Sequence, residues 1–135
     1  MSQAVMETSG AKLADLPGRA DAERAIETAL RSVNPGWLGT IVADRVHLIY
    51  ERCGYAPGDA VLEEIAAYIC ALPDGARAYR WTATSFVVLS VRRPFIVLPP
   101  SIEATCTMLP LASVHSPAEL AARLDHHVAL RVSAA

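Results

Sequence analysis

A chain of 135 residues is the size of one ordinary domain, and its 53% hydrophobic residues can build a real core. The net charge of −2 and the lack of a basic tract argue against a nucleic-acid-binding protein. No stretch approaches the roughly 18 consecutive apolar residues of a membrane span, and the N-terminus lacks the pattern of a signal peptide. We therefore expect a cytoplasmic protein with no membrane segment.

Residues 1–12 show no periodicity and are predicted to form a flexible tail ahead of one domain, residues 13–135. Hydrophobic spacing predicts these elements in chain order: a helix over 21–33, a strand over 37–42, a short helix over 46–52, a helix over 58–72, strands over 76–81, 86–90, 94–98 and 102–109, and a helix from 117 onward. This order is typical of an α+β or α/β domain, with a sheet covered by helices.

Two local signals are specific. The small polar stretch from Thr82 to Ser85 separates two β-runs and predicts a hairpin. Ser116 precedes Pro117 and stands three residues before Glu119, so we expect a capped helix start in which the glutamate bonds back to the amide of Ser116.

Cysteine and histidine are too scattered to predict a metal site or a nucleophile. Cys53, Cys70 and Cys106 form no C-x-x-C pair and are expected to be buried free thiols. His126 and His127 are adjacent and so point to different faces of their helix, without the i, i+4 spacing of zinc ligands. We predict no metal, no cofactor and no thiol chemistry at Cys106.

Three segments, in the right order, match the motifs of one known protein family. Residues 13–19, Leu-Ala-Asp-Leu-Pro-Gly-Arg, resemble the family's opening D-x-L-T-G-L-P-N-R segment. Residues 54–62 resemble G-H-x-x-G-D-x-x-L, and residues 80–89 stand where the signature hairpin R-x-G-G-D-E-F-x-x-L belongs. Together these segments resemble GGDEF domains, the diguanylate cyclase family. The resemblance covers residues 13–90 and implies a nucleotidyl-cyclase-type fold: a central, mostly antiparallel sheet with helices packed on it, in a bacterial cyclic di-GMP signalling protein.

The resemblance also shows which catalytic residues are missing. Active members join two GTP molecules with the help of two divalent cations, which carboxylate oxygens hold. The metal-binding positions fall at Val42 and Ser85, and the hairpin acid thought to assist deprotonation falls at Thr84. The two hairpin glycines become Thr82 and Ala83, and of the five G-G-D-E-F positions only the phenylalanine, Phe86, is kept. We therefore predict a degenerate signature and no cyclase activity.

Remnants of a nucleotide site are His47, Tyr50 and Asp59. By resemblance, the phosphate-facing lysine falls at His47 and the guanine-reading asparagine at Tyr50, while Asp59 keeps the second guanine-reading position. Helix capping is the favoured role for Asp59. Asp44 is expected to be a solvated carboxylate at a strand end.

The family's product-inhibition motif, R-x-x-D, is also missing. Its two charged positions are occupied by Pro73 and Ala76, so feedback binding of cyclic di-GMP is not expected. Arg77 and Arg80 are nearby. We expect them to solvate a strand edge, with a rearranged anion site as the alternative.

Only residues 91–93 separate the hairpin from the next apolar run, where the family has a helix. A deleted helix would expose an apolar surface around Phe95 and Val97, which could bind a protein partner or form a homodimer. Alternatively, the shortened loop or the tail covers the gap.

These observations favour a catalytically inactive GGDEF-like domain that acts as a signalling or protein-interaction module. The alternative function is a metal-independent sensor of GTP or cyclic di-GMP, in which Tyr50 stacks on a base. An enzyme of another chemistry in the same cleft has the least support, since no triad, metal cluster or phosphate loop is visible.

Overall fold

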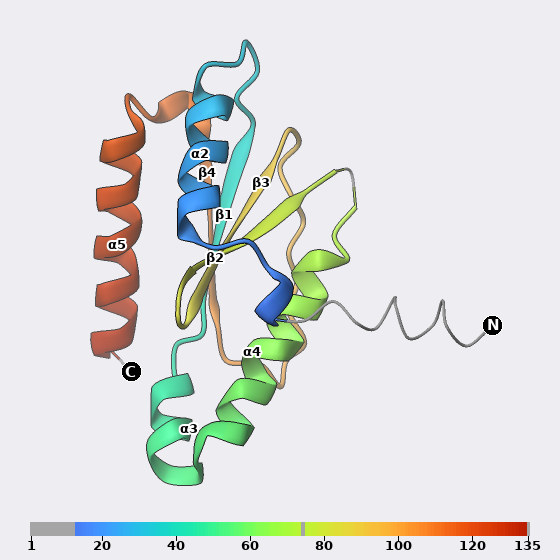
Figure 1. The fold of residues 1–135 in the computed structure, drawn as a ribbon, viewed down its shortest axis with the longest axis vertical. Coiled ribbons are helices and arrows are strands. Elements are labelled where there is room, and N and C mark those ends of the chain that lie inside the picture. Colours follow the sequence, from blue (N-terminus) through green and yellow to red (C-terminus); the bar gives the residue numbers. More distant parts are fainter. Residues whose placement is uncertain (1–12, 74, 135) are drawn as a thin grey trace, which may run out of the picture.

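The computed structural model describes residues 13–73 and 75–134 (Figure 1). Its helices (α), 3₁₀-helices (η) and strands (β) are η1 (Leu13–Asp15), α2 (Arg19–Leu30), β1 (Trp37–Val42), α3 (Val46–Cys53), α4 (Tyr55–Cys70), β2 (Arg77–Thr82), β3 (Ser85–Ser90), β4 (Thr105–Pro110), η2 (Leu111–Ser113) and α5 (Pro117–Ala134). The predicted tail, residues 1–12, lies outside the described residues.

The strands form one sheet in the order β2-β3-β1-β4, and all neighbours are antiparallel. β2 and β3 form the expected hairpin. The connection from β1 to β2 runs through α3 and α4 and passes over β3, and the connection from β3 to β4 passes over β1. The predicted fold class, an antiparallel sheet covered by helices, is confirmed.

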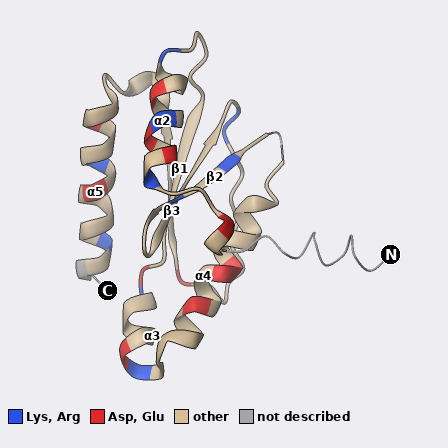
Figure 2. Ribbon diagram, in the orientation of Figure 1, with Lys and Arg blue, Asp and Glu red and all other residues tan. Residues whose placement is uncertain are grey.

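Helices cover the two faces of the sheet differently. Successive residues of a strand point to opposite faces, so β1 contributes to two cores. Leu38 and Val42 pack under α2 and α5, which lie side by side on one face. Ile41 packs under α4 on the other face. Acidic residues predominate on α4, while both signs alternate along α2 (Figure 2).

The predicted strand at 94–98 is wrong. Residues 91–104, here called the crossover, contain neither a strand nor a helix. The crossover lies across the α4 face of the sheet, where Ile96 and Leu98 pack against the core and Ile102 is part of it. Ile96 rests on Gly39 of β1, where an added Cβ would come within 3.1 Å of the Ile96 Cδ1 atom.

The predicted strand rests on apolar residues at every second position. That pattern fits a strand within the sheet and an extended segment on the face of the sheet equally well. An extended segment that lies on a sheet buries every second residue, as a strand within the sheet does. Proline has no N–H to donate to a ladder, and Pro94, Pro99 and Pro100 flank this run. The missing helix is confirmed, and the crossover covers part of the gap it leaves.

Helix ends differ from the prediction by two or three residues. α2 runs from Arg19 to Leu30 instead of 21–33, and α4 runs from Tyr55 to Cys70 instead of 58–72. Pro57 hid the start of α4, although proline is tolerated in a first turn, where N–H groups have no partner in the helix. Gly54, with φ of 90°, makes the turn between α3 and α4.

The start of α5 follows the predicted capping pattern with one change. The Ser116 hydroxyl accepts a hydrogen bond from the Glu119 N–H at 3.1 Å. The Glu119 carboxylate accepts from the N–H of His115 at 2.8 Å, one residue before the amide expected. Each contact gives a backbone N–H group at or just before the helix start a side-chain oxygen as its hydrogen-bond acceptor.

The cysteines are not buried as predicted. Cys53, Cys70 and Cys106 are all free and exposed. Partial burial still raises the pKa of the Cys70 and Cys106 thiols above the ordinary value. A raised thiol pKa disfavours the thiolate, which is the nucleophilic form of cysteine.

Three side chains join α2, β2 and α5. The Arg19 guanidinium donates to both carboxylate oxygens of Asp125, at 2.9 and 2.8 Å, and lies 4.1 Å from the ring centroid of Trp81. The Trp81 Nε1–H donates to Asp125 at 3.0 Å. The hydrogen bonds from Arg19 hold the pKa of Asp125 below its ordinary value.

We expect Asp125→Asn to lower the free energy of unfolding by about 1 kcal/mol at neutral pH, since the ion pair is partly exposed and screened by water. The folded-state pKa of Asp125 is depressed, so its stabilisation is present above the unfolded-state pKa and is lost as the pH falls through the folded-state pKa. Urea denaturation of both proteins should show the difference narrowing in acid. The exposed Asp21→Asn is the control, and a difference that does not change with pH would contradict the prediction.

Candidate functional site

The positions that the resemblance marks as catalytic lie together, at the end of β1 and the β2–β3 turn. Val42 is paired with Ser85 in the β1–β3 register, and the Ala43 N–H donates to the Thr84 carbonyl at 2.9 Å. Val42 and Ser85 are both fully buried. Neither side chain is therefore open to a bound ion.

The hairpin turn is closed by its own side chains. The Thr82 and Ser85 hydroxyls are 2.6 Å apart, and the Thr82 N–H donates to the Ser85 Oγ at 3.2 Å. The Thr84 N–H donates to the Thr82 Oγ1 at 3.3 Å. Phe86, which follows the turn on β3, is buried in the core under α4. The polar groups of this turn are thus engaged with one another.

Arg80 does not simply solvate a strand edge as predicted. Its backbone N–H donates to the Pro17 carbonyl at 2.8 Å, and its Nη2 donates to the Ala83 carbonyl at 2.7 Å. Its Nε is buried and has no hydrogen-bond partner among the described residues. Arg77 is exposed, as expected. Arg80 therefore braces the turn from β2.

Tyr50 and Asp59 bind each other. The Tyr50 hydroxyl donates to the Asp59 carboxylate at 2.9 Å, and the Tyr50 ring covers Gly58, where an added Cβ would clash with the ring. The Tyr55 ring is 5.2 Å away, centroid to centroid. Asp59 is not a helix cap, because α4 begins at Tyr55 and Asp59 falls in its second turn. His47 is half-buried on α3, one turn before Tyr50.

Partial burial is the main reason that the pKa of Tyr50 is raised, and the hydrogen bond to Asp59 adds to it. Both effects favour the neutral phenol. The corner between α3 and α4 therefore holds a protonated tyrosine, whose ring and hydroxyl are already in contact with this chain.

Asp44 is not a solvated carboxylate, contrary to the prediction. It accepts a hydrogen bond from the Thr105 hydroxyl at 2.7 Å and lies 3.5 Å from the Arg131 Nε. Its side chain is only 17% exposed. The contact ties the end of β1 to β4 and α5, so Asp44 has a structural role. No local sequence pattern predicts this role, because the partners of Asp44 are 61 and 87 residues away.

Across residues 13–73 and 75–134, no three side chains of His, Cys, Asp or Glu are grouped closely enough to hold a metal ion. His127 lies 3.4 Å from the Thr107 hydroxyl on the α5 face of β4, and His126 is exposed. None of the described helices is both long and apolar enough to cross a membrane.

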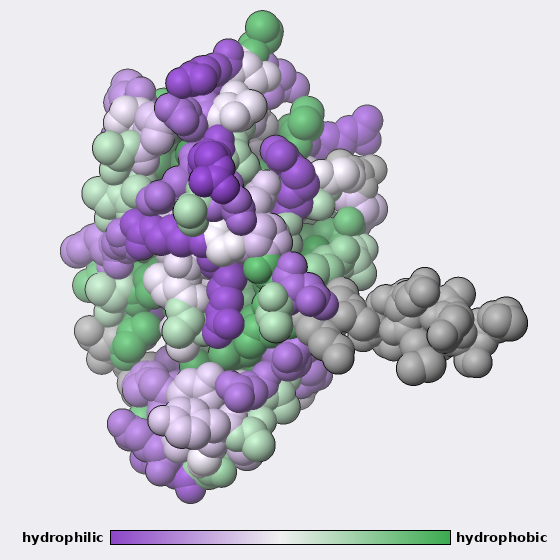
Figure 3. Space-filling model, in the orientation of Figure 1, coloured by the Kyte–Doolittle hydropathy of each residue, from purple (hydrophilic) through white to green (hydrophobic). Residues whose placement is uncertain are grey.

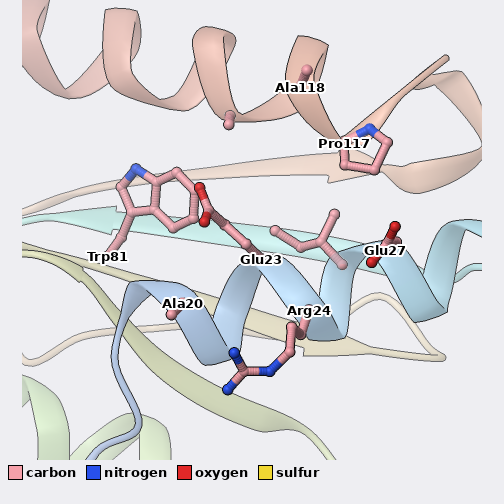
Figure 4. A pocket seen from close by; sticks show the side chains of 9 residues that line it. Ala20, Glu23, Arg24, Glu27, Trp81, Pro117 and Ala118 are labelled. Atoms are coloured by element: carbon pink, nitrogen blue, oxygen red, sulfur yellow. The ribbon is translucent and has the colours of Figure 1, made fainter.

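Hollows in the described surface lie elsewhere. One, of about 370 Å³, separates α2 from α5; Trp81 and Glu23 lie at one end of it, and Glu27 lies further along α2 (Figure 4). A second, of about 400 Å³, lies between α4 and the crossover, next to Pro73 and Phe95. Neither is lined by Val42, Tyr50, Asp59 or Ser85. The face that carries α2 is a mosaic of hydrophilic and hydrophobic residues (Figure 3).

Comparison with solved structures identifies the fold. The GGDEF domain of YfiN (TpbB) from Pseudomonas aeruginosa matches with a TM-score of 0.65 and 26% identity, over 91% of this chain and 94% of that one. The S helix-GGDEF-EAL structure of Vibrio cholerae LapD, bound to c-di-GMP, matches with a TM-score of 0.67 and 17% identity. That match covers 98% of this chain, which spans only 36% of the LapD chain.

The GGDEF domain of DgcB from Caulobacter crescentus, in complex with c-di-GMP, matches with a TM-score of 0.61 and 13% identity, over 86% of this chain and 85% of that one. No protein-family model and no curated protein matches the sequence. The chain has a GGDEF-like fold, as the three sequence segments predicted.

We expect Tyr50 to titrate above the ordinary pKa of tyrosine, and Asp59→Asn to lower that pKa only partway, because burial would remain. Ultraviolet absorbance titrations are recorded with and without Tyr50→Phe, both in the wild type and in Asp59→Asn. Within each pair, the difference between the two curves is the titration of the Tyr50 phenol alone. Tyr55→Phe is the matched control. An unchanged Tyr50 titration in Asp59→Asn would show that the hydrogen bond is absent in solution.

Proposed function

We propose that this chain is a catalytically inactive GGDEF-like module, which acts in cyclic di-GMP regulation by binding another protein. The observation that carries the proposal is the burial of Val42 and Ser85, both uncharged, at the positions where the resemblance places the metal-binding acids. Magnesium takes oxygen ligands and is usually held through carboxylates and phosphates. A valine offers no ligand, and the Ser85 hydroxyl is hydrogen-bonded to Thr82.

The surroundings of these two residues support the same conclusion. Val42 belongs to the core under α2 and α5, so its side chain points into packed apolar residues. Thr84 and Ala83, at the remaining hairpin positions, cannot accept a proton as a carboxylate can. Two-metal phosphoryl transfer has no charged group here to neutralise the cations.

The sensor alternative is weakened by the Tyr50–Asp59 contact. A guanine at the corner of α3 and α4 would have to displace the Tyr50 ring from Gly58 and break its bond to Asp59. Titration calorimetry with GTP and with cyclic di-GMP separates the two functions. Heat with either ligand that disappears in Asp59→Ala would favour the sensor.

Incubation of the protein with GTP and Mg²⁺ should yield no cyclic di-GMP, because the dications have no anionic protein ligands at Val42 and Ser85. Product chromatography against an active diguanylate cyclase measures this. Product above the enzyme-free blank would overturn the inactive assignment.

The surface that we propose for the partner is the outer side of the crossover. Phe95 is 85% exposed and Val97 is 56% exposed, while their neighbours Ile96 and Leu98 face the core. The Val97 N–H donates to the Tyr68 hydroxyl at 2.8 Å, which holds the segment on α4. Exposed aromatic residues beside a hollow are typical of interaction sites.

A photo-crosslinking amino acid at position 95 should capture a specific partner in the native cell, since an apolar contact buries that side chain in the complex. Val33, fully exposed in the turn that follows α2, is the matched control position. Equal crosslinking at positions 95 and 33, with the same products, would contradict the assignment of this surface. With the photo-crosslinking amino acid placed at position 92 instead, Phe95→Ser should abolish capture of the partner without altering the thermal stability of the protein.

A further inference from the structure

β4 forms one edge of the sheet, and its outer backbone groups are open. The Leu111 N–H donates to the Gly36 carbonyl in register with the β1–β4 pairs. In an antiparallel strand, the backbone N–H and C=O groups of successive residues point alternately to one side and the other. Those of Thr105, Thr107 and Leu109 therefore bond to β1. Cys106 and Met108 then present both N–H and C=O at the outer edge. No backbone hydrogen bond from another described residue reaches them.

The opposite edge is protected in three ways that β4 lacks. β2 carries Arg77 and Arg80, has an irregularity in its pairing between Arg80 and Thr82, and donates its Arg80 N–H to the Pro17 carbonyl. β4 has the sequence Thr-Cys-Thr-Met-Leu-Pro, with no charge, an unbroken register and a proline only at its end. Folded proteins normally block a free edge with charges, bulges or a covering segment. An unblocked edge is expected to be paired.

We propose that the open edge of β4 pairs with β4 of a second copy of this chain, in an antiparallel two-fold dimer with a continuous eight-stranded sheet (twice the four strands of one copy). This surface is distinct from Phe95 and Val97. A second copy fits because of the two-fold symmetry: Cys106 of each copy exchanges two backbone hydrogen bonds with Met108 of the other copy. Pairing stops at the dimer, since the remaining β2 edges are protected.

Pro110 selects the register, because it has no outward N–H, whereas Cys106 and Met108 each offer both an N–H and a C=O. With Cys106 opposite Met108 of the second copy, Thr107 lies beside its own counterpart, and the Pro110 carbonyl keeps its hydrogen bond from the Ser113 hydroxyl. Next to this axis lies a hollow of about 230 Å³, lined by Thr107, Met108, Arg123 and His127. Leu130, 55% exposed, falls on the same stripe of α5 as Arg123 and His127. Pairing would bring two such stripes together and bury Leu130.

Cys106→Pro tests the edge, because proline removes an outward N–H that β1 does not use. The matched control is Cys106→Ser, which keeps the donor. We expect sedimentation velocity across a concentration series to show a dimer for the wild type and for Cys106→Ser, and at least a tenfold weaker dimer for Cys106→Pro with the same circular dichroism. A monomeric wild type throughout, or an undiminished dimer in a folded Cys106→Pro, overturns the proposal.

A second variant gives an answer even if Cys106→Pro does not fold. In a background with all three cysteines replaced by serine, Thr107→Cys places the new thiols at a non-hydrogen-bonded antiparallel pair, with Cα atoms about 4.5 Å apart, within disulfide reach. We expect mild oxidation to give a covalent dimer. Ala112→Cys, exposed on η2 beyond the strand, is the control. Crosslinking at position 112 but not at 107 overturns the register and the interface.

Discussion

The antiparallel pairing of β1 with β3 is the contact on which the other features depend. It places Val42 beside Ser85 and fixes the start of the hairpin turn through the bond from Ala43 to Thr84. Since β1 is thereby a central strand, its alternate residues must enter two apolar cores. A carboxylate in place of Val42 would be buried among apolar side chains unless a cation balanced it. An uncharged residue at position 42 is therefore consistent with the dense apolar packing around it.

The polar groups that remain near this turn have found partners within the chain. Thr82 and Ser85 bond to each other, and Tyr50 bonds to Asp59. Buried or half-buried polar groups are costly when unpaired, so these internal hydrogen bonds stabilise the turn and the corner between α3 and α4. The buried Arg80 Nε is the exception in the described part of the chain. It lies on the strand that leads into the turn, where no other described group satisfies it.

The crossover shows how a sheet face can be covered without a helix. An extended segment places every second side chain on the sheet, so Ile96 and Leu98 fill part of the space under it. The same geometry forces Phe95 and Val97 outward. A helix could have turned all of its apolar residues toward the core. The apolar surface and the missing helix are thus two consequences of one change in the chain.

The sequence by itself determined the periodic elements and the family likeness: the strand from Trp37 to Val42, the hairpin and the cap at Ser116 follow from local patterns. It could not place residues 94–98, because an alternating apolar run buries equally well within a sheet or across it. It could not assign partners to Asp44, Asp59 or Arg19 either, since those contacts join residues that are 9 to 106 positions apart. Only the tertiary structure decided these points, because burial and hydrogen bonding between distant segments depend on how the helices and strands pack.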